Sequence, residues 1–144
     1  MFADFIKRLT DPAPDTLPDG DARLALTALL VRIARSDNVY SPAEKARISQ
    51  IVEHRYALAP ADRDALLADA EGLEAEAPDT VRFTRAIKDA VAYDDRLAVV
   101  EAMWKVVLAD GTRAKEEDAL LRLVTNLLGI SDMDSNQARK RVEG

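Results

Sequence analysis

Two pairs of acidic residues occur in the chain with the same spacing. Asp37 is followed seven residues later by Glu44, and Asp110 is followed seven residues later by Glu117. Each Asp stands where an apolar helical run ends, and each Glu stands in the first turn of the next run. Carboxylates and loop carbonyls are the ligands that Ca²⁺ and Mg²⁺ prefer. The four residues therefore form a candidate site for a divalent cation.

A purely structural role for the same acids is the alternative. Helix dipoles favour an acid in the first turn, and Ser41 with Glu44 matches a capping box around a proline at the first helical position. Ala114 occupies the position that matches Ser41 and cannot cap, so a box does not account for Glu117. The spacing also differs from that of an EF-hand loop, whose acids alternate before a glycine. On the sequence alone, both a cation site and a loop-and-cap role stay open.

The acidic pairs belong to a longer internal repeat. The offset between its copies is constant, since 110 − 37 and 117 − 44 both equal 73. Apolar positions keep this offset, with Ile33, Ile48 and Ile51 falling on Val106, Leu121 and Val124. We interpret the pattern as two pseudo-symmetric helix–loop–helix units, at about residues 22–58 and 95–131. A twofold relation between the halves would bring the four carboxylates into one negative patch.

Apolar spacing and stop signals predict a single-domain, all-α bundle of about seven helices over residues 21–144. The expected helices cover about 21–36, 42–56, 60–77, 81–91, 96–109, 117–128 and 132–142. The first of these is apolar almost throughout and should be central. Gly129 is expected to end the sixth helix. Residues 1–20 are expected to hold a short amphipathic helix, Phe2–Leu9, and a proline-rich linker.

Composition excludes several classes of function. The 144 residues include no cysteine, which excludes disulfides, cysteine-ligated zinc and thiol catalysis. The net charge of −6 argues against a protein that binds nucleic acid, because such proteins present a basic face. No apolar run is long enough to span a bilayer, and the N-terminus lacks the features of a signal peptide. We expect a cytoplasmic protein.

Few other residues point to chemistry. His54 is the only histidine, and we interpret it as a solvated helix residue. Trp104 and Phe83 lie on apolar helical faces, where core packing is a better interpretation than a ligand pocket. Arg96, Glu101 and Arg122 are expected to tie helices together or to hold the acidic loops. No nucleophile motif and no glycine-rich phosphate loop occurs, so we assign no catalytic residue.

The second copy resembles the TerB-like proteins, named for tellurite-resistance protein B, in an uncharacterised bacterial branch. The residues that carry the resemblance include Phe83, Trp104, Asp110-Gly111, Glu117 and Gly129-Ile130. The first copy resembles a weaker form of the same motif through Leu29-Leu30, Asp37 and Glu44, so the likeness covers roughly residues 22–130.

The resemblance implies an all-helical fold with two pseudo-symmetric halves and a role around stress response or the inner face of the membrane. It implies no enzymatic activity. It also implies that the family's acids form a divalent-cation site, which by matching position would be Asp37, Glu44, Asp110 and Glu117.

Three functional hypotheses follow. The leading one is a non-enzymatic helical module that engages a protein partner or the inner membrane surface, is modulated by Ca²⁺ or Mg²⁺ at the acidic loops, and is able to form homo-oligomers. The second is a purely structural or oligomerising helical protein without a ligand. The third, a metal-assisted hydrolase, would need an open metal position in a cleft.

Overall fold

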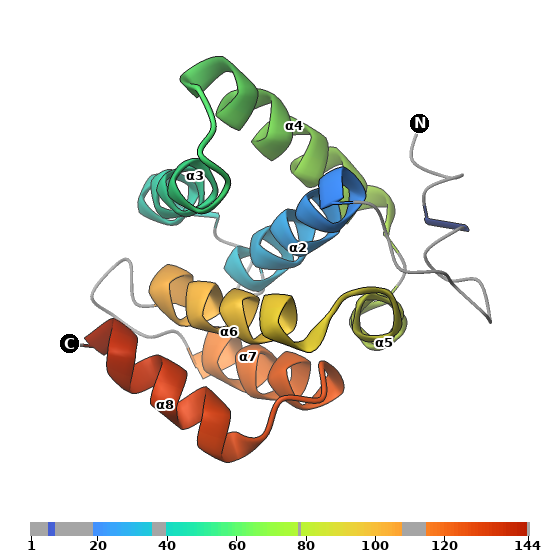
Figure 1. Cartoon of the computed structure of the whole chain (residues 1–144), viewed down its shortest axis with the longest axis vertical. Coiled ribbons are helices and arrows are strands. Elements are labelled where there is room, and N and C mark those ends of the chain that lie inside the picture. The colour runs from blue at the N-terminus through green and yellow to red at the C-terminus, as the bar shows by residue number, and fades with distance from the viewer. Residues whose placement is uncertain (1–5, 8–18, 36–39, 78, 108–114, 144) are drawn as a thin grey trace.

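The computed structural model describes residues 6–7, 19–35, 40–77, 79–107 and 115–143, and within these ranges the chain is helical without any strand. Figure 1 shows the arrangement. The described helices are α2 (Asp19–Ala34), α3 (Pro42–Tyr56), α4 (Pro60–Glu76), α5 (Thr80–Ala90), α6 (Tyr93–Val107), α7 (Lys115–Leu127) and α8 (Asp132–Glu143). The predicted all-α bundle is confirmed. The expected helix Phe2–Leu9 and the linker lie almost wholly outside the described residues, and the division at residue 20 stays a prediction.

Helix α2 is the centre of the bundle, as its apolar sequence predicts. It contacts α3, α4, α5, α6 and α7, and Figure 1 shows it between α4 on one side and α6 on the other. Its buried apolar residues lie on all sides of the helix, because each side meets a neighbour. They are Ala25, Leu26, Ala28, Leu29, Leu30, Val31, Ile33 and Ala34.

The order of the helices follows the sequence repeat. Helix α2 leads to α3 in the first half, and α6 leads to α7 in the second. The structure extends the repeat by one helix. Helix α4 packs on α2 in the first half, and α8 packs on α6 in the second. Each half is therefore a three-helix unit, and α5 connects the two halves.

Local capping explains where several helices begin and end. Asp79 accepts a hydrogen bond from Arg82 N at the start of α5, at 3.0 Å, and Ser131 accepts one from Asp134 N at the start of α8, at 3.1 Å. Gly129 follows α7 with φ = 74°, a left-handed conformation that glycine adopts without strain. These signals place the predicted boundaries correctly.

The start of α6 differs from the prediction. The helix begins at Tyr93 instead of Arg96, since Arg96 N already donates to Ala92 O at 3.1 Å. Asp94 and Asp95 therefore lie inside the first turn, where the helix dipole favours acids, and do not precede it. None of the described helices is long and apolar enough to cross a membrane.

Candidate functional site

Glu44 is the predicted site residue that the structure describes in full. It lies in the first turn of α3 and is only 2% exposed. Its backbone N donates to Ser41 Oγ at 3.1 Å, and its Oε1 accepts from Ser41 N at 3.3 Å. The predicted capping box is thus confirmed. The second carboxylate oxygen, Oε2, is buried and accepts no hydrogen bond from the part of the chain that the structure describes.

The other three predicted ligands are not placed. Asp37 and Asp110 lie outside the described residues, as does the side chain of Glu117, although its backbone belongs to the first turn of α7. Among the side chains that the structure describes, no three Asp, Glu or His gather in a way that could hold a metal ion. The four-residue cation site therefore stays a prediction.

The surroundings of Glu44 hold charges of both signs and a half-buried tyrosine. Tyr40 precedes α3, and its pKa is raised above the ordinary value, mainly by burial and further by the carboxylate of Glu71. The phenol is therefore neutral at physiological pH. Lys45 pairs with Glu71 at 3.5 Å, and the Arg35 guanidinium lies 5.1 Å from the centre of the Tyr40 ring.

A groove of about 480 Å³ runs between α3 and α6. Its floor is apolar, with Ile51, Ala98 and Ala102. Its basic walls are formed by Arg47, His54, Arg55 and Lys105. His54 is exposed, as predicted. This groove could not be predicted from the sequence, because its basic residues come from two helices about 50 residues apart and follow no common spacing.

The structure shows contacts between helices for two of the three residues predicted to tie helices together, Glu101 and Arg96. Glu101 pairs with Arg141 at 3.3 Å and so links α6 to α8. Arg96 links elements through carbonyl oxygens instead of acids: its Nε donates to Val91 O at 3.0 Å, and its Nη1 donates to Leu128 O.

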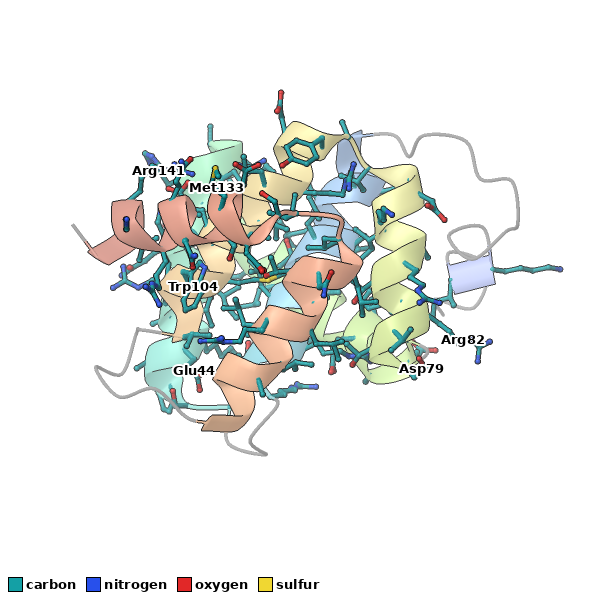
Figure 2. The ribbon with its side chains drawn as sticks, turned by 90° about the horizontal axis from the view of Figure 1, so that it is seen from below. Glu44, Asp79, Arg82, Trp104, Met133 and Arg141 are labelled. Carbon is teal, nitrogen blue, oxygen red and sulfur yellow. The ribbon has the colours of Figure 1, made fainter. Side chains whose placement is uncertain are left out.

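Trp104 and Phe83 are buried in the core, as predicted. Trp104 also borders a cavity between α6, α7 and α8, which the sequence did not reveal. Its indole Nε1 donates to Ser135 Oγ at 3.3 Å. Figure 2 shows Trp104 and Glu44 on one side of the molecule, with Asp79 and Arg82 on the opposite side.

Comparison with known proteins identifies the family. The family model described as "Tellurite resistance protein TerB" matches residues 23–140, which extend from α2 into α8. Neither the curated proteins nor the solved structures give a match. The matched region includes both three-helix units and α5, so the likeness covers the bundle as a whole. The chain belongs to the TerB family of all-helical proteins associated with tellurite resistance.

Proposed function

We propose that the chain is a non-enzymatic binding module of the stress response that holds a divalent cation, Ca²⁺ or Mg²⁺, at the start of α3. The ligands in this proposal are Asp37, Glu44, Asp110 and Glu117. The proposal rests chiefly on the buried Glu44 carboxylate, whose Oε2 accepts no hydrogen bond within the described structure. The TerB family is generally non-enzymatic, which supports the first part of the proposal.

The capping role of Glu44 does not account for both of its oxygens. The box uses Oε1, and no residue that the structure describes donates to the buried Oε2. Burying a carboxylate is costly unless hydrogen bonds or an opposite charge offset the loss of water. A divalent cation provides that offset and takes carboxylate oxygens at about 2.0–2.6 Å. The repeat places a second Asp–Glu pair at the corresponding position of the other half, which doubles the available ligands.

The position of His54 weakens the hydrolase alternative. His54 lies ten residues after Glu44 on the same helix, which corresponds to about 15 Å along α3. A metal held by Glu44 would therefore be too far from this histidine for direct proton transfer. The arrangement supports binding over catalysis.

Replacing Glu44 with glutamine tests the cation site without removing the cap. Glutamine serves at this position of a capping box, so Glu44→Gln should keep the helix and remove the charge. We expect calorimetry to show saturable binding of Ca²⁺ or Mg²⁺ to the metal-free wild-type protein, and binding at least about tenfold weaker in the variant. Asp62→Asn is the matched control, because Asp62 is an exposed first-turn acid of α4. Equal affinity in wild type and Glu44→Gln, or no binding of either ion, would refute the site.

The α3–α6 groove supports a further part of the proposal, the binding of an acidic segment of a partner protein. Arg47, Arg55 and Lys105 line the groove together with one acid, Glu101, so basic side chains outnumber acidic ones there in a chain whose net charge is −6. Arg55 also pairs with Asp95 at 3.4 Å, which leaves Arg47 and Lys105 as the main cations of the groove. Its concave shape and apolar floor suit an amphipathic helix better than a flat lipid surface. The acid–base pair Glu101–Arg141 borders it on the α8 side.

A charge-reduced groove should bind an acidic peptide less tightly. We expect Arg47→Gln combined with Lys105→Gln to weaken binding of a labelled acidic amphipathic helix by about three- to tenfold, and we expect added salt to reduce the difference. Fluorescence anisotropy measures the affinity. The control is Arg82→Gln combined with Lys88→Gln, two exposed cations on α5. Binding to phosphatidylserine vesicles without binding to the peptide would replace the protein partner with a membrane surface.

A further inference from the structure

The cavity between α6, α7 and α8 is lined mostly by polar side chains, whereas the α3–α6 groove has an apolar floor. It has a volume of about 290 Å³. Helices α6, α7 and α8, all of the second half, supply its lining. The lining residues are Trp104, Arg122, Thr125, Asn126, Asp132, Ser135, Asn136 and Arg139.

The floor of this cavity is buried and polar. Trp104 and Thr125 are each 3% exposed, and Ser135 is 7% exposed. Ser135 Oγ accepts the indole N–H of Trp104, which leaves the serine hydroxyl one hydrogen to donate. Thr125 Oγ1 is buried and makes no hydrogen bond to the residues that the structure describes. A buried hydroxyl without a partner is costly, and it is a reason to expect a bound group at this point.

The rim and walls are rich in hydrogen-bond donors. Arg122 and Asn126 belong to α7, whereas Asn136 and Arg139 belong to α8, so guanidinium and amide groups line the cavity from two helices. The Arg139 guanidinium lies 5.6 Å from the centre of the Trp104 ring. A cation held over the face of an aromatic ring has a defined position.

The charge of the lining selects the class of ligand. Two guanidinium groups and one carboxylate, that of Asp132, belong to the lining, so basic side chains outnumber acidic ones among the lining residues. Guanidinium groups match the planar oxygens of carboxylates and phosphates. Asp132 can in turn accept a hydrogen bond from a hydroxyl or ammonium group.

We propose that this cavity binds a small organic anion. Its carboxylate or phosphate group is held by Arg122 and Arg139, and an acceptor oxygen receives the hydroxyls of Thr125 and Ser135. None of its lining residues belongs to the α3–α6 groove or is one of the four acids proposed to bind a cation.

Tryptophan fluorescence gives a direct test, because Trp104 is the only tryptophan of the chain. The probes are inorganic phosphate, phosphoserine, citrate and glutamate, each titrated at constant ionic strength set with KCl. We expect a saturable change in Trp104 emission with at least one of them. A response to phosphate and phosphoserine alone assigns a phosphate ligand, and a response to citrate or glutamate alone assigns a carboxylate. The absence of a saturable response to all four overturns the proposal.

Two variants locate the binding. Thr125→Val keeps the shape of the side chain and removes the hydroxyl, and Arg122→Gln removes an exposed charge from the rim. We expect each to weaken the probe's affinity by about tenfold or more, as the loss of a hydrogen bond to a charged group does. Unchanged affinity in both variants overturns the assignment to this cavity.

Thr84→Val is the matched control for Thr125→Val. Thr84 is fully buried on α5, its Oγ1 also lacks a hydrogen bond within the described chain, and it does not line this cavity. Both valine variants should melt at the wild-type temperature or above it, because each removes a buried hydroxyl without a partner. Only Thr125→Val should lose affinity for the anion. An equal loss in Thr84→Val would show that the effect is a general change of the fold, and would overturn the proposal.

Discussion

Replacing Leu29 with alanine is expected to lower the free energy of unfolding by about 3–5 kcal/mol, the upper part of the range for truncating a buried leucine. Leu29 has no exposed surface and lies in the middle of α2. That helix contacts five others, so a void at this point is bordered by several helices that cannot all move inward. Urea denaturation, with the slope of the transition compared between wild type and variant, measures the loss.

Leu123 supplies the control for this prediction. It is 45% exposed on α7, so Leu123→Ala removes much less buried surface than Leu29→Ala and leaves no enclosed void, and it should cost less than about 1 kcal/mol. A loss below about 1 kcal/mol in Leu29→Ala, or a loss equal to that of Leu123→Ala, would contradict the central position of α2.

The ends of the helices could be predicted from the sequence because their signals are local. Ser41 and Glu44 form the expected box, and Gly129 has the expected left-handed conformation. Each signal acts within one turn of backbone, so it does not depend on the rest of the fold. The start of α6 was missed because Asp94 and Asp95 are favoured both before a helix and inside its first turn.

Helices were expected at about residues 60–77 and 132–142, and both exist, but their equivalence as the third helix of each half could not be predicted by the same means. Helices α4 and α8 occupy corresponding places on α2 and α6, yet their sequences share no motif. Helix α4 buries Leu67, Ala70 and Leu73, whereas α8 buries Ser135 and Ala138. The two helices therefore occupy equivalent packing positions without sharing a pattern of buried side chains.

The candidate sites differ in the same respect: one follows from a local sequence pattern, and the other two follow from packing between helices. The sequence predicted Glu44 from its place in a repeated local pattern, and the structure adds the burial of its second oxygen. The α3–α6 groove and the cavity beside Trp104 are built by packing between helices distant in the chain. Thr125 carries no sequence signal, because a threonine on an apolar helical face is ordinary. Its interest comes from the burial of its hydroxyl, which has no hydrogen-bond partner among the described residues.

Arg96→Leu is expected to cost about 2–4 kcal/mol, since it leaves two carbonyl oxygens without their donor. Nε of Arg96 donates to Val91 O, at the end of α5, and Nη1 donates to Leu128 O, just beyond α7. The guanidinium also lies 5.4 Å from the centre of the Tyr93 ring. One planar group thus joins the connecting helix to the second half of the bundle.

The shape of the guanidinium is the property that matters in this interaction. Arg96→Lys keeps the charge but offers a single ammonium group, which cannot reach two carbonyls in the directions that Nε and Nη1 do. We expect it to recover less than half of the stability that Arg96→Leu loses, as measured by urea denaturation. Arg82→Leu is the control, because that side chain is 76% exposed on α5 and should cost within about 0.5 kcal/mol. If Arg96→Lys were as stable as wild type, positive charge alone would be enough to hold α5 to the end of α7, and the two separate donors of the guanidinium would not contribute to stability.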